Sequence, residues 1–204
     1  MKTFTRGAVG ATALALISAG SVAFAQPAFQ NVRGTIEKLD GANLIVKSRD
    51  GTSITVKLGE PLTVRGVIKI SLSDVKPGSR VGITSLPQAA GGPPKAVEVH
   101  IFSEDIRPPE MQTPYDLVPQ STMTNATVNE TVAGNDGQTL TVKFKDGETK
   151  ILVPPGTPIA TYVPGKKEEL VPGAPVVVRA AKAPDGSFSA NAVSVGRDGF
   201  VPPM

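Results

Sequence analysis

The chain of 204 residues contains no cysteine, no tryptophan and a single histidine. The absence of cysteine excludes disulfides and a lipid-anchored lipoprotein, so sheet packing must supply the stability of the fold. A Ser-His-Asp triad would have to use His100, and no G-x-S-x-G motif accompanies the serines. Glycosidases place two carboxylates in a cleft that usually carries aromatic platforms as well, and the chain has no tryptophan for this purpose. These absences predict a protein that is not an enzyme.

Clustered positive charge and abundant aromatic residues are also missing. The 21 lysines and arginines are spread among 18 acidic residues, and aromatic residues make up 4% of the chain. Proteins that bind single-stranded nucleic acid combine a positive groove with aromatic side chains on which bases stack. The sequence therefore predicts that nucleic acid is not a partner.

The first 25 residues have the layout of a cleavable secretory signal. A short basic segment precedes an apolar run rich in small residues, which ends in an A-x-A arrangement formed by Ala23 and Ala25. Cleavage is expected after Ala25, and no twin-arginine pair is present, so the general secretory route is predicted. The mature chain would then be periplasmic or secreted and would have no membrane span.

The remaining residues contain nearly the same five-strand pattern twice. The first copy contains DGANLIVKSRDG, GEPL, VKPGSRVGI and KAVEV, and the second contains DGQTLTVKFKDG, GTPI, LVPGAPVVV and NAVSV in the same order. Asp-Gly pairs mark tight hairpin turns, and a pattern of three strands, a connection and two strands is typical of an OB-type barrel. We therefore predict an all-β fold of two tandem five-stranded OB-like barrels, residues 26–103 and 122–204. One continuous β-sandwich with a shared core is the alternative.

Alternation of apolar and polar residues predicts which side chains face the barrel interior. The stretch after Leu58 does not alternate and is expected to be a connection with one helical turn, started by Ser71 or Ser73. The predicted core positions of the first copy are Leu44, Val46, Ile54, Val56, Leu58, Val81, Ile83, Val97, Val99 and Ile101.

A proline-rich linker, residues 104–121, separates the two copies. Proline at this density prevents a regular helix or a central strand, which is typical of a stiff spacer. A bare spacer would not need the apolar and aromatic residues of this segment, so we predict that it packs into the groove between the barrels. The residues predicted to form a surface for a periplasmic protein or a small ligand are Ile106, Arg107, Tyr115 and Asp116.

His100 leaves two interpretations open. Alternation places Ala96, Glu98 and His100 on the outer face of their strand, which predicts a surface histidine beside Glu98. Alternatively, His100 could bind a divalent metal or copper together with Glu98, Glu104 and Asp105, although the spacing matches no recognised metal motif. No cofactor is predicted under the first interpretation.

Three stretches are similar to an uncharacterised family of exported bacterial proteins with two barrel-like repeats. These stretches are VEVHIFSEDIR, PYDLVPQSTMTNATV and VSVGRDGFVPPM. The resemblance implies a duplicated OB-like barrel and brings no established biochemical function, although some members are described as parts of metal transport systems. Members often have histidine and tryptophan in the linker, where this chain has MQTPYD with Tyr115 at the aromatic position.

Overall fold

A computed structural model describes residues 28–89, 91–134 and 137–204 and confirms the all-β fold class. The predicted signal peptide lies outside the described residues. Across the described ranges, no helix has the length and apolar character needed to cross a membrane. The strands are β1 (Ala28–Asp40), β2 (Asn43–Ser48), β3 (Ser53–Lys69), β4 (Arg80–Leu86), β5 (Lys95–Ile101), β6 (Met111–Pro114), β7 (Thr122–Gly134), β8 (Gly137–Phe144), β9 (Gly147–Val153), β10 (Ile159–Pro164), β11 (Pro175–Lys182) and β12 (Phe188–Gly196).

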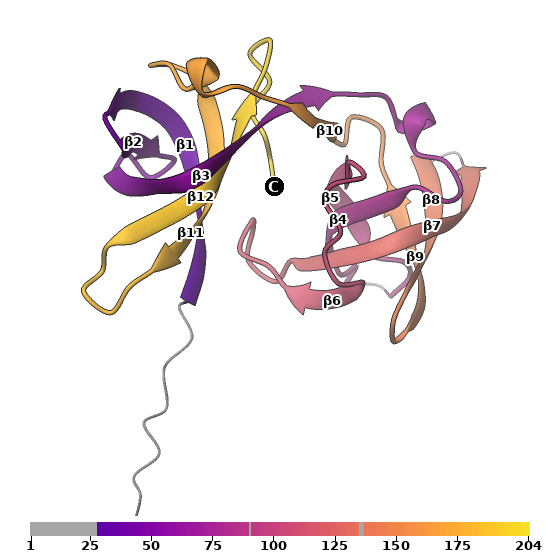
Figure 1. Ribbon diagram of the computed structural model, residues 1–204. Helices are drawn as coiled ribbons and strands as arrows, with labels where there is room; N and C mark the ends of the chain where they lie inside the picture. The colour runs from indigo at the N-terminus through magenta and orange to yellow at the C-terminus, as the bar shows by residue number, and fades with distance from the viewer. Residues whose placement is uncertain (1–27, 90, 135–136) are drawn as a thin grey trace, which may run out of the picture.

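Five strands close into the first barrel, in the order β1, β2, β3, β12, β11 and back to β1. The meander of β1, β2 and β3 is antiparallel, and β12 runs parallel to β3 from Phe188 to Gly196. Figure 1 shows the indigo and purple N-terminal strands side by side with the orange and yellow C-terminal strands in this barrel. The first barrel therefore joins the two ends of the described chain.

The second group of five strands follows the same order: β7, β8, β9, β5, β4 and back to β7. The pairing of β5 with β9 is parallel, as is that of β3 with β12, but it is limited to Lys95 opposite Leu152. Farther along β5, Val99 to Ile101 pair in parallel with Ile159 to Thr161 of β10. This barrel is built from the middle of the chain.

The strand pairing differs from the predicted barrels of residues 26–103 and 122–204. Each barrel takes a three-stranded meander from one sequence copy and a two-stranded hairpin from the other. The reason lies in β3, which does not end after Leu58 as predicted but continues to Lys69 and carries the chain across to the second barrel (Figure 1). There its end pairs antiparallel with β10, which returns in the opposite direction. Pairing with other strands thus keeps the second half of β3 extended, although its sequence does not alternate between apolar and polar residues.

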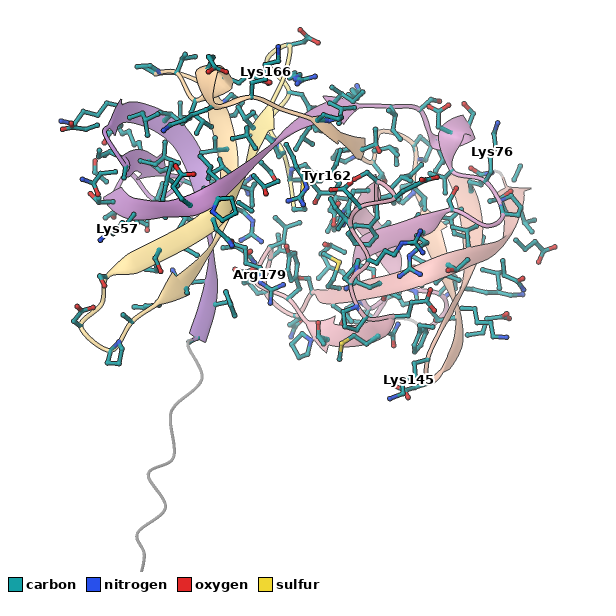
Figure 2. All side chains as sticks on the ribbon, viewed as in Figure 1. Lys57, Lys76, Lys145, Tyr162, Lys166 and Arg179 are labelled. Carbon is teal, nitrogen blue, oxygen red and sulfur yellow. The ribbon has the colours of Figure 1, made fainter. Side chains whose placement is uncertain are left out.

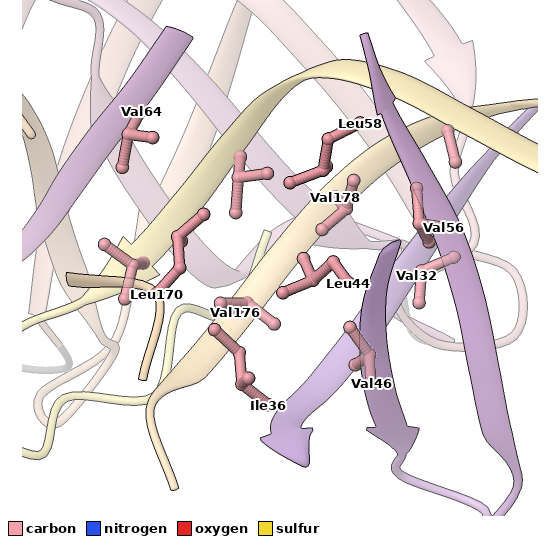
Figure 3. Packing of buried hydrophobic residues seen from close by; sticks show 13 residues of the cluster. Val32, Ile36, Leu44, Val46, Val56, Leu58, Val64, Leu170, Val176 and Val178 are labelled. Atoms are coloured by element: carbon pink, nitrogen blue, oxygen red, sulfur yellow. The ribbon is translucent and has the colours of Figure 1, made fainter. Parts of the chain in front are cut away.

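Each barrel has its own apolar core, and alternation predicted part of each. Leu44, Val46 and Val56 are fully buried in the first core, which also contains Ile36 and Val178 (Figure 3). The second core contains residues from both sequence copies: Val75, Val81, Ile83, Ala96, Val99, Ala126, Val128, Leu140, Val142, Ile151, Val153 and Ile159.

The predicted helical turn is present as a short 3-10 turn, η1 (Leu72–Asp74). The Ser71 hydroxyl accepts a hydrogen bond from the Ser73 amide, and the Asp74 carboxylate accepts one from the Ser71 amide. This reciprocal arrangement is a capping box, which fixes where the turn begins. A second turn, η2 (Lys167–Glu169), occupies the corresponding place before β11.

Candidate functional site

A cleft of about 760 Å³ lies between the two barrels. One wall comes from β1, β11 and β12 of the first barrel, and the opposite wall comes from β5, β6 and β7 of the second. Figure 2 shows the labelled side chain of Tyr162 in the gap beside the crossover and that of Arg179 lower down. The volume falls within the range of pockets that hold small ligands, about 300 to 1,000 Å³.

The linker lies against this cleft, and three of its four predicted surface residues line it. Ile106, Tyr115 and Asp116 are lining residues, whereas Arg107 is not one of them. The Arg107 side chain is exposed and donates to the backbone oxygen of Glu104 at 3.0 Å. Part of the linker forms β6, which pairs antiparallel with β7. Its one proline, Pro114, stands at the end of this short strand, where proline is tolerated.

Arg33 connects the first barrel to the linker and to the C-terminal tail. Its side chain is 8% exposed, and Nη2 donates to Asp116 Oδ1 at 2.7 Å while Nε donates to the backbone oxygen of Met204 at 3.0 Å. The guanidinium carbon lies 5.3 Å from the ring centroid of Tyr115, a distance compatible with a cation–π interaction. One buried cation on β1 therefore holds two segments that are far apart in sequence.

Asp116 is kept ionised by these contacts. Partial burial acts to raise the pKa of its carboxyl, but hydrogen bonds from Arg33 and Asn31 outweigh burial and lower the pKa below the usual value. The carboxylate is thus already paired and does not add free negative charge to the cleft.

The tail adds apolar surface at the upper end of the cleft. Met204 is 4% exposed and packs with Val67, Ala160, Tyr162 and Phe200. This small cluster joins β3, β10 and the C-terminal segment at the place where the chain crosses between the barrels.

The structure overturns the prediction that His100 is a surface residue. Its exposure is 3%, and that of Glu98 is 0%. Glu98 Oε1 accepts a hydrogen bond from the Thr84 hydroxyl at 2.5 Å, and Glu98 Oε2 lies 3.0 Å from His100 Nδ1. The prediction was wrong because the outer face of β5 is not solvated: it forms a wall of the cleft, against which aromatic side chains pack.

Val97 is also misplaced by simple alternation. The register between β4 and β5 shifts so that Thr84 lies opposite Glu98 and Ser85 lies opposite Ala96. Val97 has no partner residue on β4 and forms a β-bulge. Because of this bulge, the Ala96 side chain points into the second core, while Val97 is only half-buried.

Three rings meet at the wall formed by β5 and β10. The His100 ring is perpendicular to those of Phe102 and Tyr162, with centroids 4.7 Å and 5.8 Å away. Phe102 and Tyr162 are parallel to within 5°, with centroids 6.4 Å apart. Burial raises the pKa of the Tyr162 phenol, so the hydroxyl stays protonated at neutral pH. The wall therefore presents two parallel apolar rings with the imidazole at right angles to them.

The residues considered for a metal site are only partly brought together. Glu98 and His100 are neighbours, but Asp105 instead accepts hydrogen bonds from Ser103 at 2.6 Å and from Arg65 at 3.3 Å. These bonds, that from Ser103 foremost, lower the pKa of Asp105. Glu104 is exposed. In the part of the chain that the structure describes, no three histidine, cysteine or acidic residues are grouped to hold a metal ion.

Sequence reasoning missed Arg33, Tyr162 and Arg179, which also belong to this region. Each was predicted to lie within one barrel and not at the cleft between the barrels, because the predicted domain boundaries placed β1 and β11 in different barrels. Had these two strands been paired, Arg33 and Arg179 would have been recognised as residues of neighbouring strands, since Asn31 lies directly opposite Arg179.

Substitution of Gly82 by alanine tests how tightly the His100 ring is held. A Cβ at this position would lie 2.2 Å from His100 Nε2, and Phe102 and Tyr162 restrict movement of the ring. We expect Gly82→Ala to lower the free energy of unfolding by about 1 to 3 kcal/mol, as overpacking usually does, and to shift the NMR signals of the single imidazole.

Gly59→Ala is the matched control, because the nearest atom to a Cβ there is 3.9 Å away. It should leave the imidazole signals in place. Unchanged stability and unchanged imidazole signals in Gly82→Ala would contradict the packing described for His100.

Comparisons with models of protein families, with curated proteins and with solved structures found no match. The resemblance to an exported barrel family therefore rests on the sequence stretches and on the barrel architecture alone. Any functional argument has to come from the cleft itself.

Proposed function

We propose that this chain is an exported, non-enzymatic binding protein that holds a small ligand in the cleft between two OB-like barrels. Export is proposed from the leader sequence of residues 1–25. The observation that carries the proposal is the cleft of about 760 Å³, which combines an apolar, ring-lined wall with a few charged and polar side chains. Binding sites for small molecules commonly have this composition and size.

The arrangement of Thr84, Glu98 and His100 supports binding at a preorganised wall. Both carboxyl oxygens of Glu98 have partners, so the buried polar group is hydrogen-bonded and the imidazole is held in one orientation. Among the described residues a hydrogen-bond partner is recorded only for His100 Nδ1, while the ring itself lines the cleft. Glu98 therefore fixes the orientation of the His100 ring where the ring lines the cleft.

The metal-binding alternative gains no comparable support. His100 and Glu98 form a pair, and within the described ranges no third histidine, cysteine or acidic side chain joins them. Asp105, considered as a ligand, is engaged by Arg65.

Filling the cleft should abolish ligand binding. Ser194 on β12 lines the cleft, whereas Ser189 on the same strand is exposed and does not line it. The proteins are incubated with the low-molecular-weight fraction of a periplasmic extract or culture medium. We expect the wild type and Ser189→Trp to retain the same small molecule and Ser194→Trp to lose it. Native mass spectrometry measures the added mass.

A second blocked variant, Asn125→Trp, fills the cleft from the opposite wall and separates blocking from a local defect in β12. Thermal melts should show that both blocked variants are folded. Equal retention in all variants, or no retained molecule in the wild type, would contradict the proposal.

A further inference from the structure

The ionisable side chains that line the cleft are predominantly positive. Arg65, Arg179 and Lys182 are lining residues, and Asp116 is the one acidic side chain that lines the cleft within the described ranges. Asp116 is already paired with Arg33, a residue that lies behind the lining. The charge presented to a ligand is therefore cationic, which favours an anion.

The two cations on β11 have no carboxylate partner among the described residues. Arg179 instead lies over the Phe29 ring, 4.9 Å from its centroid, and Lys182 lies 5.6 Å from the centroid of Phe188. These contacts orient both side chains but leave their hydrogen-bond donors available. Arg65 differs, because its guanidinium forms an ion pair with Asp105.

The apolar part of the cleft lies toward the crossover and away from Arg179. Phe102 and Tyr162 present parallel rings, and Met204 packs next to Tyr162. The Tyr162 hydroxyl is protonated and has no recorded partner in the described part of the chain, so it can donate a hydrogen bond to a ligand. Figure 2 shows Tyr162 beside the crossover and Arg179 lower in the gap, so these two side chains are separated along the cleft.

We infer that the cleft binds an organic anion, a carboxylate or sulfonate attached to a flat apolar ring system. The anionic group pairs with Arg179 and Lys182, and the ring system packs against Phe102 and Tyr162. This inference rests on the proposed function, because it names the ligand class of the same cleft. The ring-lined wall supplies apolar area, and the cations supply charge-assisted hydrogen bonds that fix orientation.

Three probes with the same ring system test the ligand class. Naphthalene-2-sulfonate is anionic, 2-naphthylmethanol is neutral and (2-naphthylmethyl)trimethylammonium is cationic. We expect titration calorimetry of the full mature protein to show binding of the sulfonate at least about tenfold tighter than of the other two, since one charge-assisted hydrogen bond contributes that much or more. Added salt should weaken this preference.

Two double variants with the same change in net charge locate the anion. Arg179→Gln with Lys182→Gln should weaken sulfonate binding about tenfold or more. Lys57→Gln with Lys76→Gln removes two exposed lysines that do not line the cleft and should leave the affinity within about twofold, because screened charges at a distance contribute little. Tyr162→Leu should weaken all probes through lost ring contact.

The outcomes distinguish failure of the ligand class from failure of the cleft. Equal or tighter binding of the neutral or cationic probe, abolished by Ser194→Trp, would overturn the anion inference and leave the binding cleft standing. Binding of the sulfonate that survives Ser194→Trp and Asn125→Trp would overturn both, whereas the absence of binding by every probe would overturn the ligand-class inference alone. Equal losses in the two double variants would also overturn the inference.

Discussion

Replacement of Arg33 by methionine is expected to lower the free energy of unfolding by about 2 to 3 kcal/mol and to release the C-terminal tail. Methionine keeps much of the aliphatic volume but removes the hydrogen bonds to Asp116 and to the backbone oxygen of Met204. The Met204 oxygen would lose its partner in a buried position, whereas the half-exposed Asp116 can turn to water. Chemical denaturation measures the loss, and proteolysis near the C-terminus reports on the tail.

Lys57→Met is the control, because Lys57 is an exposed cation for which the described structure records no ion pair. It should change stability by less than about 0.5 kcal/mol, as surface substitutions usually do. Equal stability of Arg33→Met and the wild type, with an equally protected tail, would contradict the connecting role of Arg33.

The pH dependence of stability gives this prediction a second readout. Because the folded pKa of Asp116 is lowered, its contribution is present above the unfolded value of about 4 and is lost as the pH falls through the folded value. Arg33→Met removes most of this lowering. The stability difference between the two proteins should therefore be larger at pH 7 than at pH 3, which a purely steric role of Arg33 would not produce.

Local pattern was sufficient to predict the hairpin turns and the strands beside them, but not β6, β10 or the second half of β3. The Asp-Gly pairs do mark hairpins: Gly41, Gly51 and Gly186 all have positive φ values, which glycine adopts without strain. Alternation predicted the buried side of β2 and the first part of β3, and Ser71 starts the predicted turn. These features depend on residues that are close in the sequence, so they can be predicted from the sequence alone.

The partner of each hairpin could not be predicted in the same way. Both copies carry the same alternation and the same turns, so a hairpin from either copy presents an equivalent edge and face to either meander. The choice depends on whether the chain turns back after Leu58 or continues, and β3 continues because β10 and β12 pair with it. This information lies in contacts about a hundred residues away.

The candidate site was predicted in part for the same reason. The linker was correctly expected to lie in the groove, and Tyr115 and Asp116 do contact Arg33. The burial of Glu98 and His100 was missed because it depends on the neighbouring barrel, which the outer face of β5 meets. Alternation within one strand cannot predict the burial of a residue when that burial depends on how the two barrels pack together.

The exchange of hairpins between the barrels determines both cleft walls, and engineered cysteine pairs test it. Thr35 lies opposite Pro175, and Arg80 lies opposite Thr127. These pairs occupy equivalent places in the two barrels, and directly opposed residues of antiparallel strands lie about 4.5 to 5.5 Å apart at Cα, within the range for a disulfide. Barrels formed within each sequence copy would instead bring Thr35 to Arg80 and Thr127 to Pro175.

Because the natural chain has no cysteine, four double-cysteine variants of these same positions give an unambiguous readout. Intact mass after mild oxidation at low protein concentration measures the fraction of monomer with an internal disulfide. We expect nearly complete oxidation of Thr35→Cys with Pro175→Cys and of Arg80→Cys with Thr127→Cys, and reduced thiols in the other two combinations. Oxidation of Thr35→Cys with Arg80→Cys and of Thr127→Cys with Pro175→Cys, and not of the first two, would contradict the exchanged barrels and the cleft between them.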